Sequence, residues 1–385
     1  MASSIETTST TTTLKNNGNT YLSVDTNDDV AITNTLTATS PTFVTPNIGA
    51  ATVTSLNGGQ LAGNRNIVYN GEFIVAQRGA SYALTTSTIY GSVDRWAFIM
   101  ASSAAGIANQ VGDAPPAGFT KSLKLGRTAG STLTNAIRMY QILETVDSVK
   151  ARSKSYTLSF YAKAGANFSA ASSNLSIRLS EGTGSDQSVT NLPGGSLTGY
   201  SEKVSTNQVI TTSWVRYSFT GTFGGAMSQI GFGFFYTPAG TAGADDNVYI
   251  TGVQLEEGSV ATPFEHRSYG EELALCQRYY QQWGGNSNHE RIGTGFNYNT
   301  AQARVDMVLP VTMRATPTLS TPDVTKWAVE ATTGTPDCTA IALDQASPRV
   351  AAVNFTVASG LTVGQGIHVM ASNDSAARLQ LTAEL

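Results

Sequence analysis

The stretch VYITGVQLEEGSVATPFEHRSYGEELALCQRYYQQW, which runs from Val248 to Trp283, contains the clearest structural signals in the chain. Its first part, Val248–Leu255, alternates between two faces as a β-strand does. Thr262-Pro263 then keeps the chain extended, because the residue before a proline avoids helical angles. A strand followed by a corner indicates that a large β-domain ends near residue 266.

The second half of this stretch predicts a helix. Ser268-Tyr-Gly-Glu271 reads as a capping box, in which the Ser268 side chain accepts a first-turn amide and Glu271 reaches back. Gly284-Gly285 marks the end of the helix. An apolar stripe at helical spacing lies between these signals and consists of Leu273, Cys276, Tyr280 and Trp283. We expect one short helix in a connector over residues 267–284. Its stripe would either face symmetry mates near a trimer axis or, slightly favoured, pack on the preceding domain.

Composition narrows the class of protein. The chain of 385 residues is long enough for two or three domains, and its 13% of charged residues and net charge of −4 leave no basic stripe for nucleic acid. Abundant Gly, Thr, Ser and Asn with few helical patterns indicate a mainly β protein. The two cysteines are too few for a disulfide framework. We expect no signal peptide and no membrane insertion.

Residues 1–63 contain short β-like runs separated by turn signals, with little apolar surface. A disordered tail is one interpretation, since such thin strands bury too little to offset the entropy of ordering. The alternative is a β-rich shaft in which several copies wind together. Alternation at Val30, Ile32 and Leu36 favours the shaft. The side chains expected at the shared axis are Leu22, Val24, Val30 and Ile32.

Residues 64–266 are expected to form a central antiparallel sandwich or jelly roll, because about nine strands follow one another without helices between them. The segment Asn66–Phe73, with a turn at Asn70-Gly71, would open this domain. The clearest later strands are Ser122–Leu125, Ile137–Ile142, Tyr156–Lys163, Leu175–Leu179, Trp214–Phe219, Ile230–Tyr236 and Val248–Leu255.

Residues 285–385 are expected to form a small C-terminal β-sandwich. Prolines fall between its candidate strands, where a missing amide does no harm. The strands are Arg291–Tyr298, Gln302–Leu309, Trp327–Ala331, Thr339–Leu343, Arg349–Val357, Gly366–Ala371 and Ala377–Thr382.

Several phrases carry a family resemblance. NGEF…QRG…DRW, LSFYAKA, WVRYSFTGTF, GVQLEEG…TPFEHRSYGEELALCQRYYQ, VTMRATPT and ARLQLTAEL together resemble the C-terminal part of bacteriophage tail fibre and receptor-binding proteins. The opening and closing segments also look like those of carbohydrate-binding jelly-roll modules. The resemblance implies a homotrimeric virion protein of the tail, assembled in the host cytoplasm. Its N-terminal segment would join other tail or baseplate proteins, and its distal domains would touch a host polysaccharide or protein receptor.

Enzyme chemistry is the first rival to binding, since a polysaccharide depolymerase would suit such a protein. Glycoside hydrolysis needs two carboxylates across the scissile bond. Glu256-Glu257 is the obvious pair, yet adjacent strand residues point to opposite faces, so Glu256 or Glu257 is expected to anchor a strand end. Asp94 and Arg95 are expected to form a structural ion pair beside Trp96. We predict no catalytic site.

Metal and cofactor chemistry finds little support. His266, His289 and His368 lie on separate segments without ligand spacing. Asp245-Asp246-Asn247 fits an acidic turn better than a calcium site. We predict neither a metal nor a cofactor.

Binding to a glycan is the favoured function. Sugar C–H faces pack on aromatic rings beside amide or hydroxyl partners. Trp96 and Trp214 are expected in the core, whereas Tyr161 and Phe235 alternate against core positions. The ligand-binding candidates are Tyr90, Tyr161, Phe235 and Tyr236. A purely structural tail connector remains the alternative.

Overall fold

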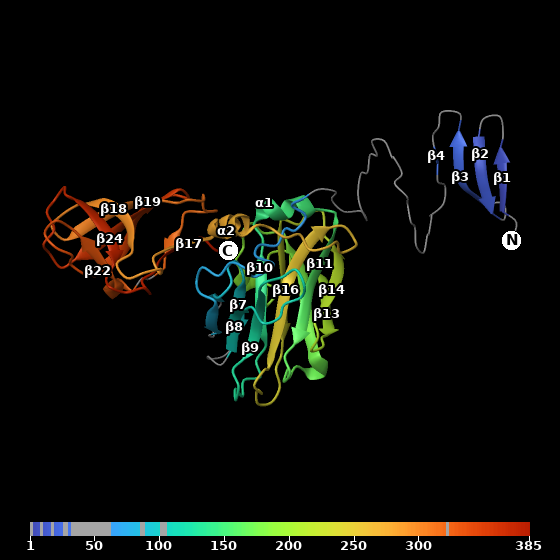
Figure 1. Ribbon diagram of the computed structural model, residues 1–385, viewed down its shortest axis with the longest axis horizontal. Coiled ribbons are helices and arrows are strands. Elements are labelled where there is room, and N and C mark those ends of the chain that lie inside the picture. The colour runs from blue at the N-terminus through green and yellow to red at the C-terminus, as the bar shows by residue number, and fades with distance from the viewer. Residues whose placement is uncertain are drawn as a thin grey trace. The chain divides into compact units, whose positions relative to one another are not determined.

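The computed structural model describes residues 63–84, 90–100, 106–320 and 323–385 with their side chains. It also describes the backbone of residue 89 and of four short strands between residues 3 and 31. The chain divides into two compact units, residues 1–53 and 54–385. The predicted mainly β fold is confirmed, since antiparallel sheets dominate both units (Figure 1).

The first unit contains a four-stranded sheet whose strands pair in chain order. They are β1 (Ser3–Thr7), β2 (Thr11–Asn16), β3 (Asn19–Asp25) and β4 (Val30–Ala31). The four axis candidates Leu22, Val24, Val30 and Ile32 have side chains outside the described residues. The intertwined shaft therefore stays a prediction.

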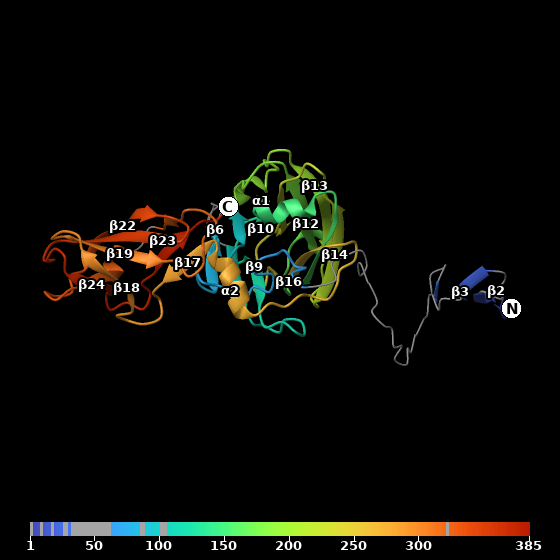
Figure 2. The ribbon, with the colours of Figure 1, turned by 90° about the horizontal axis from the view of Figure 1, so that it is seen from above.

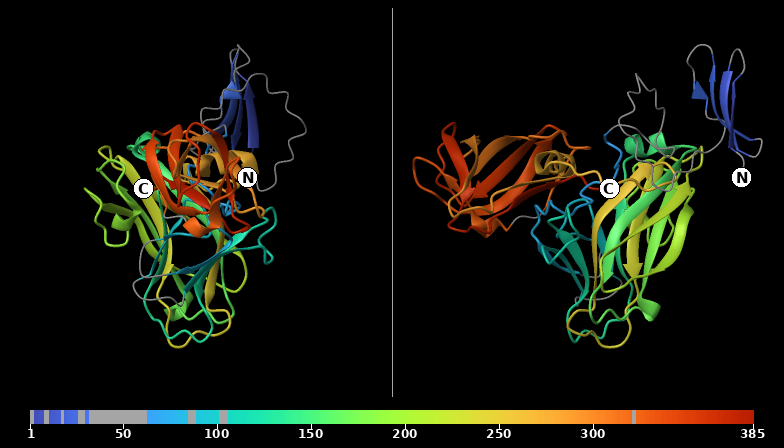
Figure 3. Two further views of the ribbon diagram at one scale, coloured as in Figure 1. Left: turned by 90° about the vertical axis from the view of Figure 1, so that its left-hand side faces the viewer. Right: turned by 45° about the vertical axis from the view of Figure 1, so that its right-hand side comes forward.

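Two six-stranded sheets face each other in the second unit and form the predicted sandwich (Figure 2). The first sheet, called the front sheet below because it carries the candidate site, has the order β13 (Ser201–Val209), β12 (Asn174–Gly182), β15 (Gln229–Tyr236), β10 (Ile137–Ile142), β7 (Ala97–Met100) and β6 (Ile89–Tyr90). The back sheet has the order β14 (Val215–Thr222), β11 (Ser155–Ala164), β16 (Asn247–Glu257), β9 (Ser122–Arg127), β8 (Gly106–Val111) and β5 (Ser81–Leu84). Figure 3 shows their long strands, coloured green and yellow, running alongside one another.

The core lies between the two sheets, where the strands turn apolar side chains inward. Trp96 is fully buried there, as predicted, and its indole Nε1 donates to the Asn70 carbonyl at 3.2 Å. Its ring meets the Phe232 ring edge-on at 5.7 Å, and Phe160 of the back sheet meets Phe234 of the front sheet at 4.5 Å. These contacts join the layers. Trp214, by contrast, is only half-buried, so the prediction of a core position was wrong for it.

The opening segment lies beside the closing strand, as the resemblance implied. Ile67 N donates to the Leu255 carbonyl at 3.0 Å, and Val253 N donates to the Gly71 carbonyl at 2.9 Å. The segment is not a regular strand, however, because Asn70 and Phe73 have φ angles of 53° and 58°. Gly71 permits the approach, since a Cβ there would lie 2.1 Å from the Val253 carbonyl oxygen.

The predicted helix exists but is shorter than expected. Helix α2 (Tyr269–Gln277) begins after Ser268, whose Oγ accepts from Glu271 N at 3.2 Å, so the N-cap is confirmed. The Glu272 carboxylate, rather than that of Glu271, reaches the chain outside the helix, where it accepts from Asn70 N at 2.5 Å. The preceding short helix α1 (Thr145–Ser148), which the sequence analysis missed, lies at the same end of the sandwich (Figure 1).

The apolar stripe is the part of the helix prediction that was wrong. Residues Tyr280–Trp283 form strand β17, which pairs with β25 (Leu379–Thr382) instead of continuing the helix. Cys276 and Tyr280 are 0% and 1% exposed within the chain, so they have no surface to offer at a trimer axis. Leu273 and Trp283 are partly buried, and Trp283 packs on the C-terminal core.

The last hundred residues contain the expected small sandwich. One six-stranded sheet has the order β21 (Trp327–Glu330), β24 (Gly366–Ala371), β18 (Arg291–Asn297), β19 (Gln302–Val308), β23 (Val350–Val357) and β22 (Cys338–Ala346). A three-stranded sheet of β17, β25 and β20 (Thr318–Leu319) accompanies it. All seven predicted strands of this region occur, while β17 and β20 were missed.

The C-terminal residues bind the central sandwich. Arg95 pairs with the Glu384 carboxylate rather than with Asp94, so the predicted Asp94–Arg95 ion pair was wrong. Asp94 instead accepts from Gln77 N at 3.1 Å. The Leu385 carbonyl accepts from the Tyr90 hydroxyl at 2.8 Å.

No described helix has the length and apolarity that crossing a bilayer would require.

Candidate ligand-binding site

The outer face of the front sheet carries the most suggestive arrangement of side chains. Alternation along β10 sends Ile137 and Met139 into the core, which leaves Arg138 and Tyr140 on the outer face. Across the sheet, Arg138 lies opposite Phe235, and Tyr140 lies opposite Gly233 of β15. On the far side of β15, Gly233 lies opposite Arg178 of β12. The sheet thus brings together side chains that are distant in sequence.

Glycines form the floor of this region. A Cβ at Gly233 would lie 2.2 Å from the Met139 carbonyl oxygen and 2.3 Å from Cδ1 of Tyr140. A Cβ at Gly231 would lie 2.2 Å from Cδ2 of Leu192. Because neither position has a side chain, the Tyr140 ring and the Leu192 side chain lean over β15. The strand sequence GFGFFY therefore packs the core with one face and leaves space on the other.

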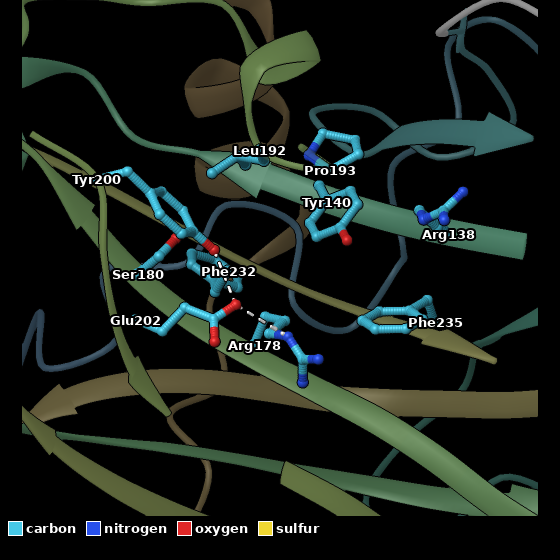
Figure 4. A pocket seen from close by; sticks show the side chains of 10 residues that line it. All are labelled: Arg138, Tyr140, Arg178, Ser180, Leu192, Pro193, Tyr200, Glu202, Phe232 and Phe235. Carbon is cyan, nitrogen blue, oxygen red and sulfur yellow. Dashed lines mark hydrogen bonds and ion pairs between the residues drawn. The ribbon is translucent and has the colours of Figure 1, made fainter. Parts of the chain in front are cut away.

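That space is a hollow of about 160 Å³. Figure 4 shows Arg138 and Phe235 at one end of the hollow, and Tyr200 and Ser180 at the other. Tyr140, Ser180, Leu192 and Phe232 are buried beneath or beside it, while the other lining side chains reach solvent. The lining residues are Arg138, Tyr140, Arg178, Ser180, Leu192, Pro193, Tyr200, Glu202, Phe232 and Phe235.

One end of the hollow carries a hydrogen-bonded chain of polar groups. The Tyr200 hydroxyl donates to Glu202 Oε1 at 3.0 Å, and Arg178 Nε lies 3.1 Å from the same oxygen (Figure 4). Partial burial alone would raise the pKa of Glu202, but hydrogen bonds from Ser205 and Tyr200 and the charge of Arg178 outweigh it and lower that pKa. Burial, followed by the Glu202 carboxylate, raises the pKa of Tyr200 to about 12. Glu202 is therefore ionised, and Tyr200 is neutral, at neutral pH.

The other end combines an aromatic ring with two cations. The guanidinium carbons of Arg178 and Arg138 lie 4.9 Å and 5.9 Å from the centre of the half-buried Phe235 ring. Such contacts hold a long side chain in place without using up its N–H donors. The hollow thus offers an apolar ring, hydroxyl groups, a carboxylate acceptor and guanidinium donors within one small space.

The structure separates the four sequence candidates. Phe235 lines the hollow, as its alternation implied. Tyr161 lies on the outer face of the back sheet, with its ring 5.4 Å from that of Phe119. Tyr90 is half-buried and bonded to the Leu385 carbonyl, outside the hollow. Tyr236 is 1% exposed and its hydroxyl donates to the Asp246 carbonyl, so its ring has no surface on which a ligand could pack.

The sequence analysis missed most of the lining. Arg138, Tyr140, Arg178, Tyr200 and Glu202 lie on three strands and a loop whose adjacency only the sheet order establishes. One signal was available: the alternation of IRMYQI separates Arg138 and Tyr140 from the apolar positions.

The other acidic side chains considered for catalysis or metal binding take part in contacts within the protein. Glu256 is 1% exposed, and both its oxygens accept from Thr262, which fits the expected strand-end anchor. Asp246 forms a fully buried pair with Arg127, and Asp245 accepts from the Tyr249 hydroxyl at 2.8 Å. Among the described residues, no three His, Cys, Asp or Glu side chains are grouped so that they could hold a metal ion.

Comparison with known proteins finds similarity at the level of structure. No protein-family model and no curated protein matches the sequence. The enzymatically active domain of tailspike protein 4 from bacteriophage CBA120 is similar over 50% of this chain and 21% of that chain, with 12% identity and a TM-score of 0.32. The match thus spans about a fifth of the length of that chain.

Two carbohydrate-binding modules are also similar. A CBM4 module matches 49% of this chain and 97% of its own length, with 15% identity and a TM-score of 0.28. The CBM22-1 xylan-binding domain of Paenibacillus barcinonensis Xyn10C matches 54% of this chain and all of its own, with 12% identity and a TM-score of 0.29. Because one fold serves many functions, the function has to be argued from the hollow.

Proposed function

We propose that the chain binds glycans in the hollow on the front sheet and serves as the host-attachment protein of a bacteriophage tail. The hollow itself carries the proposal for binding. Phe235 presents an apolar ring, while Tyr200, Glu202 and Arg178 present hydroxyl, carboxylate and guanidinium groups beside it. A sugar ring matches this combination, since its C–H face packs on an aromatic ring and its hydroxyls need donors and acceptors.

The size of the hollow indicates how much of a glycan it takes. Its volume of about 160 Å³ lies below the roughly 300–1,000 Å³ of pockets that enclose drug-sized ligands. One sugar unit fits such a space better than an oligosaccharide does. The rest of the chain of sugars would then extend along the open outer face.

Binding without cleavage is the proposed activity. Hydrolysis of a glycosidic bond generally uses two carboxylates, about 5–10 Å apart, that flank that bond. Glu202 is the one acidic side chain in the lining of the hollow. It is ionised and held by Arg178 and Tyr200, so it is suited to accept hydrogen bonds from sugar hydroxyls rather than to donate a proton.

The tail-fibre role rests on the sequence resemblance given above. We propose a homotrimer in the virion tail, joined to other tail or baseplate proteins through residues 1–63. A small hollow on each protomer binds weakly by itself. Three copies facing one surface combine such contacts through avidity.

The binding proposal is tested by Phe235→Ala, with Tyr161→Ala as a matched aromatic control on the back sheet. Removing the Phe235 ring takes away the apolar platform and part of the packing of both arginines. We expect affinity for host-surface polysaccharide to fall about tenfold or more, which corresponds to about 1.4 kcal/mol. Equal affinities of the two variants, measured by calorimetry on folded protein, would contradict a site at the hollow.

The attachment proposal has a separate test. Purified full-length protein should compete with phage particles for host cells and reduce adsorption. Glycan binding without any effect on adsorption would point instead to a connector within the tail. Release of reducing ends from the bound polysaccharide would point to a depolymerase.

A further inference from the structure

The arginines of the hollow differ in whether an acidic side chain neutralises them. Arg178 pairs with Glu202 at 3.1 Å. Arg138 is different: it forms no ion pair among the described residues. Its hydrogen bonds are one with the Tyr140 side chain and a long one, 3.4 Å, to the Ala136 carbonyl. The lining therefore carries two guanidinium groups and one carboxylate, which leaves one positive charge uncompensated.

Most of the other arginines in the described part of the chain pair with acidic side chains. The chain has a net charge of −4 and 13% charged residues, and many of its arginines are committed to acids. Arg78 and Arg95 share Glu384, Arg127 pairs with Asp246, and Arg278 pairs with Glu144. Arg138 has no acidic partner among the described residues and is placed against the Phe235 ring at the rim of the hollow.

We propose that the hollow selects sugars that bear a carboxylate, such as uronic acids, and that Arg138 binds that carboxylate. This inference rests on the proposed glycan-binding function and names the ligand class of that site. A guanidinium group presents parallel N–H donors whose spacing matches the two oxygens of a carboxylate. Charge-assisted hydrogen bonds of this kind are about twice as strong as neutral ones.

The charge count favours a carboxylate over a phosphate. A carboxylate carries a single negative charge and neutralises the one free guanidinium. A phosphate monoester carries about −1.5 to −2 at neutral pH, which exceeds the available positive charge. Its excess charge would also lie in the same small hollow as the Glu202 carboxylate.

The arrangement also sets the orientation of the sugar. Glu202 lies toward the end of the hollow away from Arg138 (Figure 4). Because Glu202 is ionised, it repels the sugar carboxylate and accepts hydrogen bonds from hydroxyls instead. The acidic group of the sugar therefore lies beside Arg138 and Phe235, and its hydroxyls lie toward Glu202 and Tyr200.

The test compares acidic glycans with their carboxyl-reduced forms. Oligomers of galacturonic, glucuronic and mannuronic acid, their carboxyl-reduced neutral counterparts, and sugar phosphates are titrated into the full chain by calorimetry. We expect at least one uronate series to bind about tenfold more tightly than its neutral counterpart. In Arg138→Gln we expect that preference to vanish. Arg138→Lys, which keeps the charge without the fork, should retain part of the preference.

Lys163→Gln is the matched control, because Lys163 is a cation lying 4.7 Å from the Tyr249 ring on the back sheet. It should leave the preference intact, and thermal unfolding should show that all variants fold. Equal binding of uronates and neutral sugars overturns the carboxylate inference and leaves the proposed function standing. Tighter binding of phosphates, or a preference that survives in Arg138→Gln, also overturns it. Failure of every glycan to bind overturns the proposed function itself.

Discussion

The two outer faces of the sandwich carry similar aromatic and arginine side chains, but one face leaves them open and the other covers them. The front sheet exposes Arg138, Arg178 and Phe235 around an open hollow. The back sheet carries Tyr161 and Arg216 opposite each other on neighbouring strands. There, the Phe119 ring lies 5.4 Å from Tyr161, and Phe264 and His266 each lie 5.1 Å from Phe119. Loop residues therefore cover the aromatic surface of the back sheet.

Loops decide which aromatic–cation pair stays open. On the back sheet, Arg216 Nη2 donates to the Ser159 hydroxyl of β11 and to the Thr262 carbonyl of the covering loop, which ties this side chain to the loop. On the front sheet, the loop that brings Leu192 over β15 leaves Arg138 at the rim of the hollow, with no acidic partner among the described residues. An aromatic residue on a strand is thus a binding candidate only where no segment of the same chain has already covered it.

The largest predicted effect concerns the cover of the back sheet. Glu256→Ala removes the buried acceptor of three donors. They are the backbone N–H and the hydroxyl of Thr262 and the side-chain amide of Gln254. Leaving buried donors unsatisfied costs about 1–3 kcal/mol each, so we expect the free energy of unfolding to fall by about 3 kcal/mol. Urea denaturation measures this change.

The neighbouring carboxylate is the control for that prediction. Glu257 forms an ion pair with Lys154 at 2.8 Å, and both side chains are substantially exposed. Glu257→Ala should cost less than about 1 kcal/mol, as exposed ion pairs do. Similar losses in the two variants would show that Glu256 does not anchor the loop, and the contrast between the faces would need another cause.

A smaller effect is expected from filling the hollow of the front sheet. Gly233→Ala places a methyl group 2.2 Å from the Met139 carbonyl oxygen and 2.3 Å from the Tyr140 ring, so strand and ring must shift. Overpacking of this kind costs about 1–3 kcal/mol of unfolding free energy. We also expect glycan affinity to fall, because Tyr140 is displaced into the hollow.

Gly270→Ala in α2 is the control, since no described atom other than its chain neighbours and the backbone of its own helix lies within 4 Å of the added methyl group. Alanine in a helix is favoured over glycine by up to about 1 kcal/mol, so this variant should be as stable as the parent or more so. A Gly233→Ala protein with parental stability and affinity would mean that glycine is not needed beneath the hollow.

The smallest effect is electrostatic and depends on pH. The folded state lowers the pKa of Glu202 from its ordinary value of 4.5, so the carboxylate contributes stability above that value and loses it as pH falls through the lowered pKa. Since its side chain is 36% exposed, solvent screening keeps the contribution below about 1 kcal/mol. Thermal unfolding of Glu202→Gln and parent should differ slightly at pH 7 and converge in acid.

A stability difference that grows on acidification would contradict this sign. Glu256 is 1% exposed whereas the Glu202 side chain is 36% exposed, so the effect at Glu202 should stay the smaller of the two.

Strand patterns were the most predictable part of the molecule. Ile137–Ile142 and Gly366–Ala371 were predicted to the residue, because alternation of apolar and polar side chains is a local property. Strand β13, with the polar sequence SEKVSTNQV, was missed because it lies at the edge of its sheet and buries little. The helix was predicted too long because Tyr280 and Trp283 fit a helical stripe equally well. Pairing with β25 decides that they form a strand.

The candidate site was less predictable than the fold. Phe235 could be chosen from its alternation, but nothing local distinguishes it from Tyr161, which is covered, or from Tyr236, which is buried. The partners of Phe235 come from β10, about a hundred residues before it, and from β12, about sixty residues before it. These residues meet Phe235 only through the order of strands in the sheet. Sheet neighbours are set by long-range pairing, which a single sequence does not encode locally.

By itself, the sequence determined the class of structure, the positions of most strands, the N-cap at Ser268 and the absence of a basic stripe. These follow from composition, alternation and capping, which act over a few residues. Only the tertiary structure decided that Gly231 and Gly233 lie beneath Leu192 and Tyr140, and that Arg138 lines the hollow with no acidic partner among the described residues. The physical reason is that burial and charge pairing depend on neighbours brought together by folding.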